Sequence, residues 1–300
     1  RWFPNIINQG GEKVTLRSLL TLLNFKANHR KLIVTDSSKG GTHHFVSLVT
    51  CANPHDGSGS HSNVALKVKG SIAQDIIQSE RKIVELAGGT FKDPAVLSSE
   101  ESKGDVSVSL ITDKAIQEKV LEVLRATKEG DAVDLLMFYF SDRHILQELV
   151  DASLRGVKIR IILDPNKDAF GMKKNGIPNR ETADSLVKKS DGNISVRWCD
   201  TQGEQCHGKL LIINSDEQYS LILGSANYTR RNIGGYNLET NLFVQGIYPY
   251  ESWLSAQIYF EELWSNENFV FSTDYETYKD ESKFKKIISW VMENTGLGTF

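Results

Sequence analysis

Two patterns of apolar and polar residues alternate along the last two thirds of the chain. Residues 105–112, 132–140 and 157–164 are typical of strands that lie in a sheet. Between them, 114–130 and 144–156 carry apolar residues at helical spacing, and each ends on a glycine. Strands that alternate with helices of this length predict an α/β sheet with helices on its faces.

Asp113 stands directly before the first of these helices, where its side chain can cap the helix. The polar segment 170–193 predicts a loop with a short helix at the rim of the domain. The remaining patterns predict strands at 194–200, 209–214, 219–225 and 237–246 and helices at 251–266 and 283–294. The tryptophan and tyrosine residues of 248–264 have helical spacing, which favours the core over a lipid surface, and 283–294 is expected to be a terminal packing helix.

The chain contains an internal repeat. Three pairs of segments match in the same order, with offsets of 178, 174 and 176 residues: 29–36 with 207–214, 50–53 with 224–227, and 62–70 with 238–246. The first copy has only 28 residues ahead of its histidine, whereas the second follows a long strand-helix-strand region. We therefore expect two related halves, of which the first lacks its early strands because an N-terminal part is missing.

Composition narrows the class of protein. The chain has 300 residues, 40% hydrophobic and 24% charged, which is typical of a folded globular protein and excludes a disordered chain. Its formal charge of -3 gives no overall basic field that would attract nucleic acid. The apolar stretch 135–140 is far too short to span a membrane, and no signal peptide opens the chain. Three cysteines are too few for a disulfide framework, although Cys199 and Cys206 could pair.

Each copy of the repeat carries a histidine and a lysine two residues apart, followed by an asparagine. The two sets are His29, Lys31 and Asn53 in the first copy, and His207, Lys209 and Asn227 in the second. Residues two apart in a strand share one face, so each imidazole lies beside its ammonium while Arg30 or Gly208 points away. Apolar runs follow both pairs and predict buried strands, and the ends of such strands are where α/β sheets form their sites.

The pattern HxK(x)4D with a downstream GSxxN, present twice, resembles the phospholipase D superfamily, in particular two-motif bacterial phospholipases D and cardiolipin synthases. The match runs from Asn28 to about Trp264. The resemblance implies an α/β fold of two related halves, each a mixed β-sheet flanked by helices, with a pseudo-twofold axis and the active site between the halves. We expect residues 1–103 to form the first repeat and 104–300 the second, so that a monomer suffices for the site.

The resemblance also implies a mechanism. One neutral histidine attacks phosphorus and forms a phosphohistidine, while the other, protonated, gives a proton to the leaving alcohol. By analogy, His29 is the nucleophile and His207 is the general acid. Lys31 and Lys209 would neutralise the phosphoryl oxygens, and the two asparagines would donate hydrogen bonds as charge develops. No metal or other cofactor is required.

A nucleophilic histidine needs its other ring nitrogen held by an acceptor. The resemblance places this acceptor in the strand after the GSxxN, which gives Glu239 in the second half and Asn63 at the matching place in the first. We expect each acceptor to serve the histidine of its own half. Glu239 would then favour a protonated His207, and Asn63 would orient His29 without adding charge.

Three further supporting positions include departures from the family pattern. Asp36 matches the aspartate of the first motif, whereas Asn214 replaces it in the second. Ser225 belongs to the GSxxN of the second half, whereas the first half has Thr50 and Cys51 in place of the glycine and serine. None of these positions is a reacting group, so we expect activity to survive the departures.

Other polar residues leave alternatives open. Four histidines after the first motif could suggest zinc, but they lack a standard spacing, which favours a polar loop near the mouth of the site. They are His43, His44, His55 and His61. Arg230 and Arg231 are almost as typical of a solvated surface as of a phosphate or headgroup site.

The sequence therefore predicts a metal-independent phosphodiesterase or phosphatidyltransferase that acts on phospholipids through a phosphohistidine, with water or an alcohol as acceptor. Peripheral contact with a bacterial membrane or a cytoplasmic location is expected. A nuclease of the same superfamily is one alternative, but it needs a basic groove that the charge does not indicate. The other alternative is a binding protein without turnover, which the intact residues of both copies disfavour. Hydrolysis or transfer, and the preferred headgroup, stay open.

Overall fold

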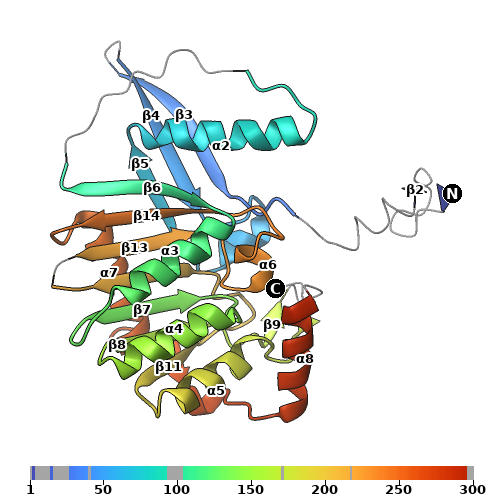
Figure 1. The fold of residues 1–300 in the computed structure, drawn as a ribbon, viewed down its shortest axis with the longest axis vertical. Helices are drawn as coiled ribbons and strands as arrows, with labels where there is room; N and C mark the ends of the chain where they lie inside the picture. Colours follow the sequence, from blue (N-terminus) through green and yellow to red (C-terminus); the bar gives the residue numbers. More distant parts are fainter. Residues whose placement is uncertain are drawn as a thin grey trace.

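A computed structural model describes residues 2–3, 14–15, 27–39, 42–92, 104–169, 172–216 and 218–295. Its main body is an eight-stranded mixed sheet with the strand order β15-β11-β8-β7-β12-β13-β14-β6, flanked by helices (Figure 1). A smaller sheet, in the order β3-β4-β5, packs at the β6 end of this body. The α/β fold class predicted from the sequence is confirmed.

The large sheet contains every strand that the sequence predicts between 105 and 246. Its strands are β6 (Val106–Thr112), β7 (Ala132–Met137), β8 (Lys158–Leu163), β11 (Ile194–Cys199), β12 (Lys209–Asn214), β13 (Tyr219–Gly224), β14 (Thr240–Gly246) and β15 (Ser272–Asp274). β8 is parallel to both β7 and β11, and the other neighbouring strands are antiparallel. The antiparallel pairing of β12 with β13 places the start of β12, at Lys209, and the end of β13, at Gly224, at the same end of the sheet.

Helices cover both faces of the large sheet. They are α3 (Lys114–Arg125), α4 (Arg143–Leu154) and α5 (Asn179–Lys189) on one face and α7 (Glu251–Ser265) on the other, with the short α6 (Arg230–Ile233) and the C-terminal α8 (Lys283–Thr295) beside them (Figure 1). Alternate residues of β12 belong to different cores: Leu211 and Ile213 pack on the α3 and α4 side, and Leu210 and Ile212 on the α7 side. Burial of both faces explains the unbroken apolar run of this strand.

The two predicted C-terminal helices pack in different ways. Trp253 is buried, and Tyr250, Tyr259 and Trp264 pack against the same core, so the core assignment is confirmed for them. It is wrong for Tyr248, which is 67% exposed just before α7. In α8 the buried residues are Ser289 and Glu293, while Phe284 is 71% exposed. The surface that receives α8 is polar, and Ser141 donates a hydrogen bond to the Glu293 carboxylate at 2.6 Å. The terminal helix therefore packs through polar contacts.

The small sheet is entirely antiparallel. It consists of β3 (Leu32–Lys39), β4 (Thr42–Thr50) and β5 (Ala65–Lys69), and it is followed by α2 (Ile72–Leu86). The prediction of a mixed sheet in each half is wrong for the described part of the first half. Its strands match β12, β13 and β14, which are antiparallel in the second half as well.

Short elements complete the described chain. They are β1 (Trp2–Phe3) paired with β2 (Val14–Thr15), β9 (Asp168–Ala169) paired with β10 (Met172–Lys173), and the 3-10 turns η1 (Asp56–Ser60) and η2 (Tyr275–Thr277). The predicted rim segment 170–193 contains the expected short helix, α5. Among the described helices, none has the length and apolar character needed to cross a membrane, as the sequence predicts.

Candidate functional site

The two histidine motifs meet where the small sheet packs on the large one. His29 lies just before β3, and its backbone N–H donates to the carbonyl oxygen of Leu238, just before β14, at 2.9 Å. In the second motif, a Cβ on Gly208 would lie 2.5 Å from a side-chain carbon of Leu136 on β7. Glycine therefore lets the segment that carries His207 lie directly against the sheet.

Each histidine is held by an acceptor from the other half of the chain. The Nδ1 atom of His29 lies 2.9 and 3.0 Å from the two carboxylate oxygens of Glu239. The Nδ1 atom of His207 lies 2.9 Å from Oδ1 of Asn63. The predicted acceptors are therefore found, but the pairing within each half is wrong. Glu239 and Asn63 each face the histidine of the opposite motif, because the small sheet packs against the large one.

Glu239 is fully buried and makes several hydrogen bonds. Ser225 donates to one carboxylate oxygen at 2.5 Å, and the Asn232 side chain donates to the other. Burial alone would raise the pKa of Glu239, but the bonds from His29, Ser225 and Asn232 outweigh it and hold the pKa below its ordinary value. His29 thus faces a carboxylate that stays ionised.

Two hydrogen bonds from the amide nitrogen of Asn63 fix the orientation of its side chain. Its Nδ2 atom donates to the carbonyl oxygens of Ser58 and His61 at 2.8 and 3.0 Å, which turns Oδ1 toward His207. His207 must then carry its proton on Nδ1, and Nε2 is left free. Cys51 stands where the second half has Ser225, and its thiol lies 3.5 Å from the same Asn63 oxygen. Cys51 therefore replaces the serine of the family pattern but still places a hydrogen-bond donor beside the acceptor of the histidine, as Ser225 does in the second motif.

The two lysines have matching environments. Lys31 Nζ donates to the carbonyl oxygen of His29 at 2.7 Å, and Lys209 Nζ donates to that of His207 at 2.8 Å. Both side chains are buried, and burial lowers the pKa of each lysine to about 8. Two cationic groups therefore lie beside the two imidazoles, in a site that favours an anionic ligand.

The pKa of His207 is strongly depressed. Burial is the main cause, and the positive charges of Lys209 and Lys31 add to it. The residue is 4% exposed, and its ring centroid lies 4.9 Å from that of Phe138. Without a bound anion His207 is therefore neutral.

The structure brings some of the remaining predicted residues to the site and not others. Asn227 is buried, and its Oδ1 atom has no hydrogen-bond partner among the described residues. Asn53 is half-buried, and its backbone N–H donates to Ser58 Oγ at 2.9 Å. Asp36 and Asn214 are exposed and lie further along β3 and β12, away from the histidines. Those two side chains do not line the site.

The extra histidines form no metal centre in the part of the chain that the structure describes. His61 Nδ1 accepts a hydrogen bond from the backbone N–H of Gln205 at 3.0 Å, and its ring centroid lies 6.1 Å from that of His207. His61 therefore borders the site, as expected of a polar loop near its mouth. The side chains of His43 and His44 lie outside the described residues.

Arg30 and Asp113 join the two halves next to the site, and sequence reasoning missed this contact. The buried Arg30 guanidinium donates to Ser79 and Glu80 of α2 and to Asp113 at 2.7, 3.1 and 3.1 Å. The Asp113 carboxylate also accepts from the backbone N–H of Glu239 at 2.8 Å and makes no cap bond to its helix. The side chain of Asp113 therefore does not cap the helix as predicted. In the sequence, only the expected outward direction of Arg30 indicated that this arginine could pair with an acidic residue elsewhere in the chain.

A second unpredicted residue, Asp164, fixes the approach to His207. Its carboxylate accepts from the backbone N–H groups of Cys206 and Asn166 at 2.8 and 2.7 Å. Burial raises the pKa of Asp164 to about 6 despite these bonds. Cys206 is also joined to Cys199 by a disulfide, so the pairing considered from the sequence is confirmed. Cys206, the residue before His207, is thus held by a hydrogen bond and by a disulfide.

The comparisons with known proteins agree with the predicted superfamily. Residues 120–264 match the family model described as cardiolipin synthase, PLD-like domain. The structure of phosphatidylserine synthase from Haemophilus influenzae is similar, with a TM-score of 0.56 and 11% sequence identity. The match covers 85% of this chain and 68% of the synthase chain. Polyphosphate kinase from Porphyromonas gingivalis matches 91% of this chain, which spans only 40% of that protein, with 16% identity and a TM-score of 0.50. A search of curated protein sequences finds no match.

A smaller structure also matches. Nuc from Salmonella typhimurium, a phospholipase D family member, covers 57% of this chain and 98% of its own, with 17% identity and a TM-score of 0.43. The resemblance to the phospholipase D superfamily is confirmed by the family model, which matches residues 120–264. The chain therefore has the phosphodiesterase- and phosphotransferase-type fold of this superfamily.

Proposed function

We propose that the chain is a metal-independent phosphodiesterase or phosphatidyltransferase of phospholipids that works through a phosphohistidine. The observation that carries the proposal is the pair of histidines with unlike acceptors, the Glu239 carboxylate on His29 and the Asn63 amide on His207. The description of the matching family model as cardiolipin synthase supports phospholipids as the substrate class. The site lies between the two repeats of one chain, so a monomer can carry it.

In the first step, Nε2 of His29 attacks phosphorus and the bond from phosphorus to the leaving oxygen breaks. That oxygen takes the proton from Nε2 of His207 and departs as an alcohol. The attack leaves a positive charge on the His29 ring, which the ionised Glu239 stabilises through Nδ1–H. His207 is the stronger acid because its Nδ1–H faces a neutral amide oxygen.

Substrate binding prepares His207 for this role. Burial, and after it the positive charges of Lys209 and Lys31, depress the pKa of His207 in the free protein. A bound phosphodiester carries a negative charge that offsets the two ammonium groups, so the pKa of His207 rises and the ring takes up a proton. Asn53 and Asn227 would donate hydrogen bonds from their side-chain amides to the phosphoryl oxygens, and the buried position of Asn227 supports this role.

In the second step, neutral His207 takes a proton from water or from an alcohol. The oxygen attacks phosphorus, and the bond between phosphorus and Nε2 of His29 breaks. His29 returns to its neutral form and His207 again carries the proton. Water gives hydrolysis, and an alcohol gives transfer of the phosphatidyl group.

The proposal is tested by headgroup release from mixed phosphatidylglycerol and phosphatidylcholine vesicles in EDTA. We expect release by the intact protein and its loss in His29→Ala and in His207→Ala. His144→Ala is the matched control, because His144 is exposed on α4, and it should keep full activity. Acid-labile phosphate on the intact protein should be absent from His29→Ala. Cleavage of single-stranded DNA without release from vesicles, or release that EDTA abolishes, would overturn the proposal.

A further inference from the structure

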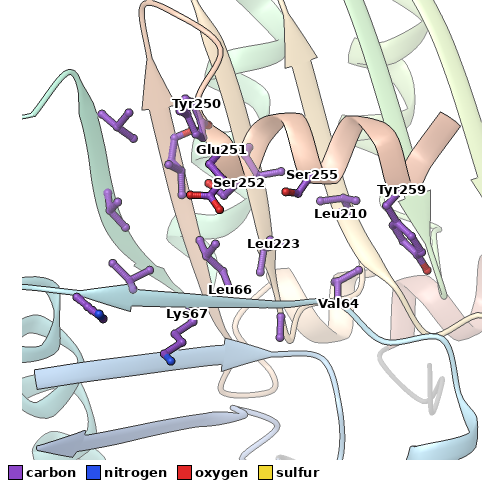
Figure 2. Close-up of a pocket in the computed structure, with 18 of the residues that line it drawn as sticks. Val64, Leu66, Lys67, Leu210, Leu223, Tyr250, Glu251, Ser252, Ser255 and Tyr259 are labelled. Carbon is purple, nitrogen blue, oxygen red and sulfur yellow. The ribbon is translucent and has the colours of Figure 1, made fainter. Parts of the chain in front are cut away.

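A third histidine, His61, lies beside the two that the proposed mechanism uses. The backbone N–H of Gln205, in the segment that leads to β12, donates a hydrogen bond to Nδ1 of His61 at 3.0 Å. The segments that carry these residues stay together further along the chain, because Val64 and Leu210 pack in one apolar cluster. Figure 2 shows both side chains among those that line the cavity between β5 and the large sheet. His61 is therefore fixed against the segment that carries His207.

The other half of the molecule shows what this contact does. When the matched segments of the repeat are extended, His61 pairs with Asn237 and Gln205 pairs with Ala27. The Asn237 side chain accepts a hydrogen bond from the backbone N–H of Ala27 at 3.2 Å, two residues before His29. Gln205 likewise stands two residues before the second histidine of the site. Each repeat thus supplies one side-chain acceptor that holds the segment before the histidine of the other repeat.

His61 does this with one ring nitrogen and keeps the other. Because Nδ1 accepts from a backbone N–H, the neutral ring carries its proton on Nε2. No hydrogen-bond partner of Nε2 is found among the described residues. Burial is the main cause that holds the pKa of His61 below its ordinary value, so the ring is neutral near pH 7. His61 is half-exposed, whereas Asn237 is buried, and it therefore offers a ligand a donor whose tautomer is fixed by the fold.

The ring of His61 lies close to the proposed general acid. Its centroid is 6.1 Å from that of His207. In the proposed mechanism His207 protonates the oxygen of the leaving alcohol, so that oxygen lies beside His207 and near His61. Hydrogen bonds of about 2.9 Å at each ring leave room between the rings for two oxygen atoms on adjacent carbons. A diol therefore fits between the two donors.

We propose that His61 is a specificity-determining residue, whose Nε2–H donates to a hydroxyl oxygen on the carbon next to the ester carbon of the leaving headgroup. This assignment rests on the proposed function, in which His207 protonates the leaving oxygen. A glycerol headgroup supplies the second hydroxyl. A choline headgroup carries a trimethylammonium group on the same carbon and has no acceptor there. In transfer, the entering alcohol occupies the same place, because His207 then takes its proton.

The test measures binding rather than turnover, so its outcome is separate from that of the proposed function. Hexylphosphoglycerol and hexylphosphocholine share an alkyl ester without an acceptor, and each is titrated into the full chain by isothermal titration calorimetry. All proteins carry His29→Ala, which prevents the covalent step. His61→Asn removes the Nε2 donor and keeps an acceptor for Gln205, as Asn237 does in the other half. His144→Asn, exposed on α4, is the matched control.

We expect the chain with His61 to bind hexylphosphoglycerol about five- to tenfold more tightly than hexylphosphocholine, which is the effect of one hydrogen bond. His61→Asn should reduce this ratio to less than about twofold at an unchanged melting temperature, and His144→Asn should retain it. Equal affinities of the chain with His61 for the two diesters, a ratio that survives His61→Asn, or no binding of either diester would each overturn the assignment. If the ratio behaves as expected but vesicles release no headgroup, the proposed function alone fails.

Discussion

Glu239 and His29 are 210 residues apart in the chain, yet the carboxylate of one holds the imidazole of the other at 2.9 Å. The reciprocal contact joins His207 to Asn63 across 144 residues. The imidazoles of His29 and His207 are thus each oriented by a residue from the other repeat motif. Neither half can form a complete site alone, and the carboxylate and the amide give the two histidines different proton affinities.

Glu239→Gln should lower kcat strongly. An amide cannot stabilise the positive charge that forms on His29 during attack, and a carboxylate-to-amide change at such a position costs roughly two to four orders of magnitude in kcat. The measurement is headgroup release, with the melting temperature recorded because Ser225 and Asn232 also bind this group. Glu148→Gln replaces another buried glutamate, which pairs with Arg155 away from the site, and should leave kcat unchanged. Full activity in Glu239→Gln would remove His29 from the role of nucleophile.

Asn63→Asp should shift the pH dependence of the reaction upward. A carboxylate beside Nδ1 raises the pKa of His207, which burial and the lysines now depress. Activity that needs protonated His207 is lost as pH rises through this pKa, so the falling limb of the kcat/KM profile should move to higher pH by a unit or more. The profile is measured from pH 5 to 9 for both proteins. An unchanged falling limb would mean that another group supplies the proton.

The sequence predicted the two histidine–lysine pairs and the two acceptors, but not which acceptor each histidine meets. His29, Lys31, His207 and Lys209 follow from local spacing, since residues two apart in a strand share a face wherever the strand lies. Which histidine Glu239 reaches depends on how the two sheets pack, and no spacing within a repeat contains that information. The strands of the second half were predicted well because runs buried on both faces are continuous, as in β12.

The contact between Arg30 and Asp113 was missed for a related reason. Asp113 occupies the position of a helix cap, and its sequence neighbourhood favours that role. In the structure the pairing with a buried guanidinium 83 residues away takes precedence, since Arg30 is 4% exposed and needs acceptors. Long-range ion pairs of this kind carry no periodic signal.

Arg30→Met should destabilise the chain and lower its activity together. The change leaves Asp113 without its cation and removes a contact between α2 and the backbone of Glu239. Loss of one partner from a buried pair costs up to about 3–5 kcal/mol, and because Glu80 and Asp113 are partly exposed we expect about 2 kcal/mol by urea unfolding. Arg197→Met, whose partner Asp274 is largely exposed, should cost at most about 1 kcal/mol and serves as the control. Equal losses in the two variants would show that the Arg30 contact has no special weight.

His207 should make the stability of the protein fall as the solution becomes acidic. Its pKa in the folded chain lies far below 6.5, mainly because the ring is buried, whereas in the unfolded chain it is close to 6.5. Below pH 6.5 the unfolded chain therefore binds a proton that the folded chain does not, and the free energy of unfolding decreases by about 1.4 kcal/mol per pH unit. Glu239, whose pKa is lowered, acts in the same direction only near and below its unfolded pKa of about 4.3. Asp164, whose pKa is raised to about 6, acts in the opposite direction between pH 5 and 6.5, so the difference in slope between the intact chain and a His207 variant is what reports on this histidine. Urea unfolding at pH 5, 6 and 7 in a buffer without phosphate should show a shallower slope for His207→Gln than for the intact chain, and the same slope as the intact chain for His144→Gln. Parallel slopes for all three proteins would contradict a buried, neutral His207.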